Sequence, residues 1–332
     1  MKASRWTVTL ICAVFLSSAL PGFAGDDKKK DPNAIGDRKV AHRSLTSVEK
    51  EIAVGKQYAN EIDQSARQIK DPLVAEYVNR LAQNLGRNSD LTIPLTVKVL
   101  DDPSLNAFAL PGGFLYVNSG LILAADEESQ VAGVVSHEIA HVAARHWASQ
   151  QTKSMLMQLA MIPLIFTPMS YPVYMGAMQG MQIGIPLAFL KFSRSAEAEA
   201  DLLGLQYMYK AGYDPTAYVT FFSKIIEKER SSPGSMSAIF ASHPPTPERI
   251  LAAEENIKTI LPQRDQYLVS TSEFEDVKAR LQTIMTARKK DDKKDGPTLR
   301  KRDAADQTAG QAPDDTKDSK EDEKPPVLKR RD

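Results

Sequence analysis

The sequence predicts an α+β fold that is mostly helical, with a small β-sheet lying beside one central helix. Several segments carry apolar residues at helical spacing between capping residues and glycine or proline breaks. The segment at 95–100 instead alternates apolar and polar residues, as a strand does, and a second short strand is expected after a Pro-Gly-Gly turn. The length of 332 residues and the 42% apolar content are those of an ordinary globular protein that can bury a core.

Charge and cysteine content exclude several classes of protein. Basic and acidic residues are equal in number, 42 of each, which argues against a nucleic-acid-binding protein held by bulk electrostatics. A single cysteine, Cys12, excludes a disulfide framework and any zinc site built on cysteines. A metal would therefore have to be bound by carboxylates and by the five histidines.

Residues 1–24 have the pattern of an export signal. Lys2 and Arg5 precede a largely apolar run, and the segment ends on Gly22-Phe23-Ala24, with small residues where a signal peptidase cleaves. We expect cleavage after Ala24 and an exported, periplasmic protein. Retention of the segment as a membrane anchor is the alternative.

Composition divides the rest of the chain into three parts. Residues 25–43 are polar and charged, and we expect a flexible leader there. Residues 44–287 contain the predicted helices and strands and are expected to form one folded domain. Residues 288–332 are mostly charged and contain few large apolar residues, so they cannot bury enough surface to offset the entropy of ordering. We expect a disordered tail.

The first half of the folded segment contains two helices and two strands. Thr46 and Glu49 form a capping-box pattern before a helix that extends to about residue 62. A second helix, at 71–86, begins with an Asp-Pro cap and ends at a glycine. The strands are expected at 95–100 and, after a Pro-Gly-Gly turn, at 114–117.

A long helix opens at the acidic residues 126–128, where negative charge suits the positive end of a helix. Proline and glycine then mark the remaining elements. These are a helix that ends at Gly212, helices that begin at Asp214-Pro215 and Thr246-Pro247, a short edge strand at 267–269 and a final helix at 274–284.

The long helix contains the sequence His137-Glu138-Ile139-Ala140-His141. Residues four apart lie on one face of a helix, so both imidazoles can reach one ion. Glu138 lies beside them and can reach a water on the metal instead of the metal itself. This spacing is typical of zinc peptidases, whereas two unrelated histidines on a helix surface would give the same letters.

A catalytic zinc site needs a third protein ligand. Glu197 is the first acidic residue after the motif, and Asp201 follows one helical turn later on the same face. This spacing suits a ligand together with a carboxylate that supports a ligand histidine. On a continuous helix His146 would point away from the metal, and Glu199 would point away from Glu197 and Asp201.

Taken together, these motifs resemble the zinc metallopeptidase family of the CaaX prenyl proteases, HtpX and BepA. The resemblance covers most of the folded segment. It rests on the sequence at 106–113 (Asn-Ala-Phe-Ala-Leu-Pro-Gly-Gly), the motif at 137–141, Glu197-x-x-Ala200-Asp201, and Ser242-His243-Pro244 followed by Arg249. It implies a zincin domain of the gluzincin type with one zinc ion per chain.

The resemblance also assigns roles to individual residues. It implies that His137, His141 and Glu197 bind the zinc ion and that Glu138 is the general base. It further implies that His243 and Arg249 belong to the active site, with His243 either binding the reacting carbonyl or capping the zinc at rest. Arg249 also falls in the first turn of a helix, against the helix dipole, which favours a task beyond solvation.

The expected function is hydrolysis of peptide bonds in exported, unfolded or misassembled envelope proteins, without nucleic acid. We expect the substrate to add as an extra strand along an edge at 114–117. Residues 154–190 are uncharged but interrupted by proline and glutamine, and are expected to form an apolar lid that touches a membrane or an apolar substrate. Two alternatives remain open: a membrane-associated protease of lipidated or membrane substrates, and a metal-stabilised, chaperone-like binder without turnover.

Overall fold

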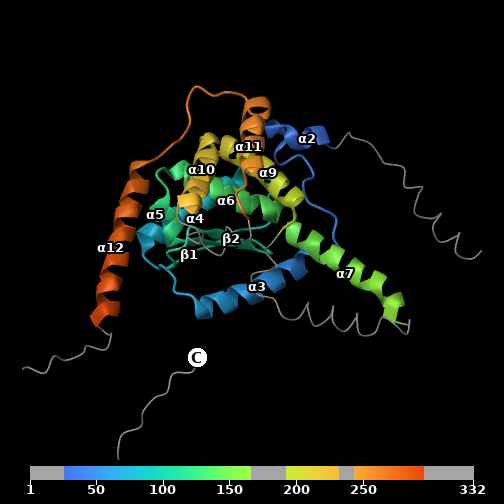
Figure 1. The fold of residues 1–332 in the computed structure, drawn as a ribbon, viewed down its shortest axis with the longest axis horizontal. Coiled ribbons are helices and arrows are strands. Elements are labelled where there is room, and N and C mark those ends of the chain that lie inside the picture. The colour runs from blue at the N-terminus through green and yellow to red at the C-terminus, as the bar shows by residue number, and fades with distance from the viewer. Residues whose placement is uncertain (1–25, 166–191, 232–242, 295–332) are drawn as a thin grey trace, which may run out of the picture. The chain divides into compact units, whose positions relative to one another are not determined.

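The computed structural model describes residues 26–165, 192–231 and 243–294 (Figure 1). The chain separates into two units, Met1–Ala287 and Arg288–Asp332, and the fold and the site belong to the first. The predicted signal segment at 1–24 lies outside the described residues. So do residues 166–190 of the predicted lid and residues 295–332 of the predicted tail.

Helices make up most of the described fold, as predicted, and they surround a small sheet (Figure 1). The helices are α2 (Asp26–Lys30), the 3-10 helix η1 (Pro32–Ala34), α3 (Val48–Ser65), α4 (Pro72–Arg87), α5 (Ser119–Ala124), α6 (Glu128–Ala143), α7 (His146–Ile165), α9 (Arg194–Ala211), α10 (Thr216–Ser231), α11 (Pro247–Ile260) and α12 (Ser272–Lys294).

The described strands form one sheet in the order β1-β3-β2. β1 (Thr96–Leu100) runs parallel to β3 (Phe114–Asn118), and β2 (Ala107–Leu110) runs antiparallel to it. Both predicted strands are therefore present. The prediction that 114–117 is an edge strand is wrong, because β3 is the middle strand and β2 lies at the edge. β2 escaped detection because all four of its residues are buried and apolar, so no alternation marks it.

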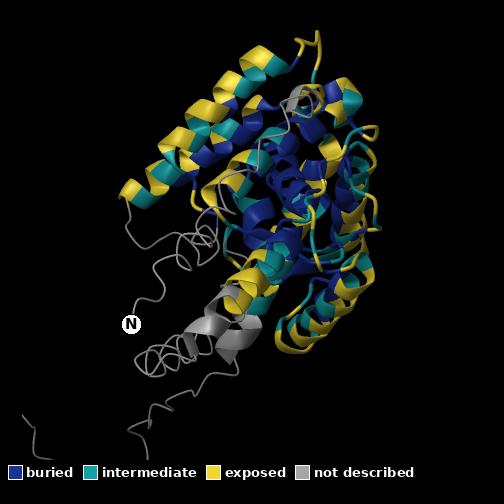
Figure 2. Cartoon of the chain, turned by 90° about the vertical axis from the view of Figure 1, so that its right-hand side faces the viewer, coloured by how far each residue is buried: buried dark blue, intermediate teal, exposed yellow. Residues whose placement is uncertain are grey.

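α6 lies at the centre of the fold. It packs against α4, α9 and α10 and against β2, and nearly all of its residues are buried. A helix that is buried on every side needs an almost wholly apolar sequence, and the polar exceptions in α6 include the His-Glu-x-x-His residues. Figure 2 shows the buried turns in the middle of the molecule and exposed residues on the outer faces.

Helix boundaries agree with the capping patterns, with two corrections. α12, predicted at 274–284, extends to Lys294 and so enters the segment at 288–332 that is predicted to be disordered. Ser47, not Thr46, caps α3, and its hydroxyl accepts a hydrogen bond from the backbone of Lys50. Gly212 ends α9 in the left-handed conformation, with φ of 93°, as glycine at this position does. Thr246 caps α11 as predicted. The edge strand predicted at 267–269 is present only as an isolated bridge between Tyr213 and Leu268.

Two glycines allow close approaches that fix the surroundings of the site. A Cβ atom on Gly55 of α3 would lie 1.7 Å from the carbonyl oxygen of Pro111, so α3 lies directly against the turn between β2 and β3. A Cβ atom on Gly204 of α9 would lie 3.1 Å from the backbone nitrogen of His137. These contacts position the edge strand and bring α9 against α6.

The flexible leader predicted for residues 25–43 is wrong over its described part. Ile35 and Val40 are buried in the main core. Arg38 forms a buried ion pair with Asp90, at 2.9 Å between Nη2 and Oδ2. The composition of the segment is polar on average, but a few apolar side chains and one buried ion pair suffice to hold it against the domain.

α7 leaves the domain with an apolar surface. Met155, Leu156, Met157 and Leu159 are all exposed. Among the helices that the structure describes, none combines the length and hydropathy needed to cross a bilayer.

Candidate metal centre

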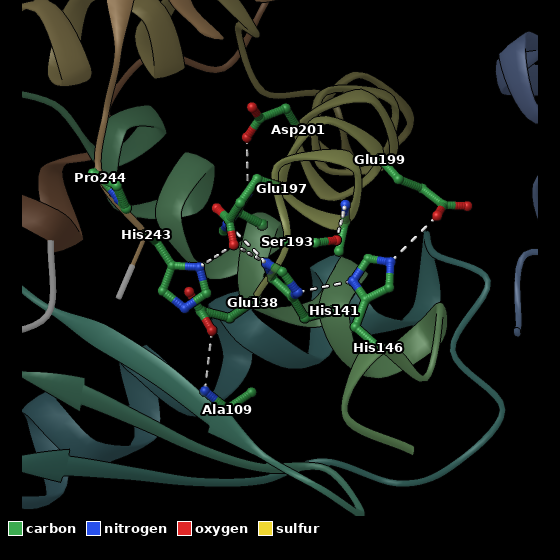
Figure 3. A network of polar contacts seen from close by, with 12 residues as sticks. Ala109, Glu138, His141, His146, Ser193, Glu197, Glu199, Asp201, His243 and Pro244 are labelled. Carbon is green, nitrogen blue, oxygen red and sulfur yellow. Dashed lines mark hydrogen bonds and ion pairs between the residues drawn. The ribbon is translucent and has the colours of Figure 1, made fainter. Parts of the chain in front are cut away.

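The predicted ligands come from two helices and one loop that meet at a buried point (Figure 3). α6 contributes His137 and His141, and α9 contributes Glu197. His243 lies just before α11, and its side chain enters the same point. All four side chains are buried.

The ligand atoms converge as a metal site requires. The Nε2 atoms of His137 and His141 lie 3.1 Å apart, and each lies 3.5 Å from a carboxylate oxygen of Glu197. His243 Nδ1 lies 2.8 Å from Glu197 Oε1. One ligand atom from each of the four residues lies within 4.8 Å of the others.

The donor set fits a divalent cation such as zinc. Burial, together with the neighbouring imidazoles, holds the pKa of His141 well below its usual range, so this ligand is neutral. Burial opposes ionisation of Glu197, but its bonds to His137 and His243 outweigh this and lower its pKa. Two imidazoles and one carboxylate form a known zinc ligand set. The cluster is therefore able to bind a metal ion.

Asp201 lies behind His137, as the sequence predicts for a supporting carboxylate. Its Oδ1 atom lies 3.0 Å from His137 Nδ1, on the side of the ring that faces away from the ligand cluster. The Tyr218 hydroxyl donates a hydrogen bond to the same oxygen. Burial alone would raise the pKa of Asp201. The hydrogen bonds from Arg249 and His137 outweigh this effect and lower the pKa below its usual value, so the carboxylate is ionised.

Arg249 joins the cluster from α11, but its donors are used by carboxylates and backbone carbonyls. Nε and Nη2 donate to the two oxygens of Asp201, at 2.8 and 2.6 Å, and Nη1 lies 3.0 Å from Glu197 Oε2. The same Nη1 atom donates to the carbonyls of His243 and Pro244. Arg249 thus holds the ligand helix and the His243 loop together.

Glu138 faces the edge of the sheet. Its Oε2 atom accepts a hydrogen bond of 3.1 Å from the backbone nitrogen of Ala109 in β2 (Figure 3). Burial raises the pKa of this carboxyl group. Glu138 therefore lies between the metal cluster and the edge strand.

Sequence reasoning missed a second cluster that borders the first. His42, His146 and Glu199 bring their side chains together, and His146 Nδ1 lies 2.8 Å from His141 Nδ1. The prediction that His146 points away from the site fails because α6 ends at Ala143 and a turn at residues 144–145 separates it from α7. The turn uses Arg145 with φ of 56°, a conformation that no sequence pattern marks in an arginine.

Comparison with known proteins finds similarity to a family of peptidases. The profile of peptidase family M48 matches residues 68–257, which include all of the predicted ligands. The Beta-barrel assembly-enhancing protease of Escherichia coli (strain K12) is 30% identical over 278 residues, which cover 82% of this chain and 55% of the relative.

More distant relatives match shorter segments. The Mitochondrial metalloendopeptidase OMA1 of Schizosaccharomyces pombe is 31% identical over 180 residues, 54% of this chain and 52% of the relative. That of Arabidopsis thaliana is 35% identical over 129 residues, which cover 39% of this chain and 25% of the relative. The chain thus spans about half the length, or less, of these curated relatives.

Proposed function

The chain belongs to peptidase family M48, and from this membership and the cluster geometry we propose that it is a zinc-dependent endopeptidase. The observation that carries the proposal is the convergence of His137, His141 and Glu197 on one buried point. Glu138 lies beside that point, on the side of the open sheet edge. A metal site and a base are thus combined next to a strand that can bind a peptide.

His137, His141 and Glu197 would hold the ion, one per chain. When bound, zinc supplies Lewis-acid chemistry that polarises a carbonyl group and lowers the pKa of water. Asp201 fixes the ring of His137 by its contact with Nδ1, and such a contact sets both the tautomer and the orientation of a ligand imidazole.

Glu138 acts as the general base in this proposal. Its carboxylate takes a proton from the attacking water and returns it to the leaving amine. The Ala109 amide holds one carboxylate oxygen, which leaves the other for the proton. Burial raises the pKa of Glu138, and a carboxylate with a raised pKa is a more effective base near neutral pH than an exposed one.

The substrate peptide would add to β2, in place of the 114–117 strand expected from the sequence. Asn118 donates its backbone N–H to the carbonyl of Asn106. Alternation along an antiparallel ladder then turns the amides of Ala107 and Ala109 away from β3, and Ala109 does donate outward, to Glu138. A peptide that pairs with this edge would pass directly over the base.

We also propose that the substrates are unfolded or misassembled exported proteins. The export pattern at 1–24 and the similarity to a Beta-barrel assembly-enhancing protease support an exported, periplasmic site of action. The exposed apolar residues of α7, such as Met157 and Leu159, favour peripheral contact of the 154–190 segment with a membrane or with an apolar substrate. Such contact is compatible with the same peptidase activity.

Glu138→Gln tests the proposal. The variant keeps the size of the side chain and is not a ligand, so it should bind zinc like the wild type but cleave casein about 10²–10⁴ times more slowly. His141→Ala is the matched loss of a ligand and should lose both zinc and activity. Zinc content by mass spectrometry and casein hydrolysis measure the two effects. Unchanged turnover in Glu138→Gln would exclude it as the base.

A further inference from the structure

His42, His146 and Glu199 form a second cluster, which contacts His141 on the side away from the first. Figure 3 shows His146 between His141 and Glu199. His146 is buried between the two sites. Its Nδ1 atom faces His141 at 2.8 Å, and its Nε2 atom faces Glu199 Oε2 at 3.3 Å. The proposed reaction does not use any of these three residues.

A turn at Arg145 places His146 beside His141, and residues of another part of the chain stabilise this turn. Arg145 has a left-handed backbone, which residues other than glycine adopt only where their surroundings enforce it. Its side chain donates to Glu51 of α3 and to the carbonyl of Thr46. α3 thus anchors the turn that returns His146 to His141.

The positions of the protons follow from the atoms that face one another. The Nε2 atom of His141 points to the ligand cluster, so a bound metal takes its lone pair and leaves the proton of the neutral ring on Nδ1. That proton faces His146 Nδ1, which must then be the acceptor. A neutral His146 therefore carries its own proton on Nε2, where the Glu199 carboxylate accepts it.

We propose that His146 and Glu199 are positioning residues that hold ligand His141, through a hydrogen-bonded chain from its Nδ1 atom to the Glu199 carboxylate. This inference rests on the proposed function in requiring a metal at the first cluster. It gives each ligand histidine a carboxylate partner on α9. Asp201 supports His137 directly, and Glu199 supports His141 through His146.

Lys29 anchors the far end of this chain, and His42 also contacts Glu199 but lies outside the chain to His141. Lys29 donates to Oε1 at 2.8 Å, and His42 Nε2 lies 2.6 Å from Oε2. A second metal ion bound by His42, His146 and Glu199 is the rival interpretation. A metal there would need a free lone pair on His146 Nε2. The hydrogen bond from His141 to His146 Nδ1 requires that Nε2 carry the proton instead. Such a metal would also lie close to the Lys29 ammonium group.

Zinc affinity tests the chain without reference to turnover. His146→Phe keeps an aromatic ring but removes the acceptor, and its Kd for zinc, measured by competition with a chromophoric chelator, should rise about tenfold to hundredfold. His146→Gln retains an acceptor for His141 and a donor for Glu199, and should recover most of the affinity. Glu199→Gln, which removes only the charge, should also weaken zinc binding, and it serves if His146→Phe does not fold.

Two controls make the result specific. His42→Ala touches Glu199 but lies outside the chain to His141, so its Kd for zinc should remain close to that of the wild type. The visible spectrum of the cobalt-substituted protein should change in His146→Phe and not in His42→Ala. If His146 only stabilised the fold, the spectrum would be the same in both variants.

Equal zinc affinity in wild type, His146→Phe and Glu199→Gln would overturn the inference. So would two metal ions per wild-type chain, one of which is lost in His42→Ala, because this is the result that the second-metal interpretation expects. A wild type that binds zinc tightly but cleaves no protein would instead contradict the proposed function alone.

Discussion

His243 is the fourth residue of the candidate metal cluster. Its Nδ1 atom lies 2.8 Å from the ligand Glu197 and close enough to the other ligand atoms to complete a four-residue cluster. It reaches this point from the loop before α11, which Arg249 fixes through the carbonyls of His243 and Pro244. With a metal held by His137, His141 and Glu197, the imidazole of His243 would take the fourth ligand position of the cluster.

We therefore expect His243→Ala to increase kcat/KM for a peptide substrate while zinc content stays unchanged. Removal of the ring opens the fourth position of the cluster, which a catalytic zinc site must keep free. Hydrolysis of a fluorogenic peptide and metal analysis measure the two quantities. If kcat instead falls about 10²–10³-fold with zinc intact, His243 is a donor to the reacting carbonyl oxygen and does not cap the metal.

We expect Arg249 to stabilise the folded domain as well as to support the site, and so to have more than a catalytic role. Arg249→Ala leaves the buried Asp201 carboxylate without its bidentate partner, and breaking a buried pair in this way costs about 3–5 kcal/mol. The free energy of unfolding from urea titration in excess chelator measures this cost. Arg80→Ala is the matched control, because Arg80 pairs with Glu273 through two exposed side chains and such pairs contribute about 0–1 kcal/mol.

An Arg249→Ala protein as stable as the wild type would contradict this assignment. A fall in activity with unchanged stability would move Arg249 from support of the ligands to contact with the substrate.

The meeting of the residues of the metal-binding cluster could be predicted in part from the sequence because helical periodicity is a local property. His137 and His141, like Glu197 and Asp201, are four residues apart, so each pair needs only one regular helix. His146 could not be found in this way. Its contact with His141 depends on a left-handed arginine that Glu51 and the Thr46 carbonyl hold from another helix.

At the scale of elements, the order of strands decides which backbone is open to a substrate. The alternating pattern located β1 and the Pro-Gly-Gly turn located β3, but neither signal carries information on which strand lies in the middle. β2 lies at the edge because the tight turn at Gly112 and Gly113, both with positive φ, folds it back on β3 beyond the parallel pair. The edge strand beside Glu138 is thus the strand with the weakest signal in the sequence.

Ala107→Pro tests the role of this edge. Ala107 is the first residue of β2 and its amide faces away from β3, so proline there removes an outward donor while the ladder to β3 is kept. We expect KM for a long peptide to rise several-fold with zinc content unchanged. Ala107→Gly retains the N–H group and is the control for the altered side chain. Equal KM values for the two variants would remove β2 as the substrate edge.

At the scale of the whole molecule, the site connects segments that are far apart in the sequence. α6, α9 and the start of α11 each contribute to one cluster, and the segment at 28–43 packs onto α9 through contacts such as that of Arg38 with Gln206. Composition predicted a leader there because it averages over residues. A metal that binds this cluster binds the folded state alone, since the unfolded chain does not bring the ligands together.

We therefore expect zinc removal to lower the stability of the domain. A ligand that binds only the folded state stabilises it by about 2.7 kcal/mol at a free concentration one hundred times its Kd. For a domain of this size that corresponds to a fall in Tm of about 5–10 °C on treatment with excess chelator. Calorimetry with and without added zinc measures the shift. His141→Ala, which lacks one of the proposed ligands, should melt at the same temperature in zinc and in chelator. A wild type that also melts at one temperature in both conditions would show that metal binding at the cluster does not stabilise the fold.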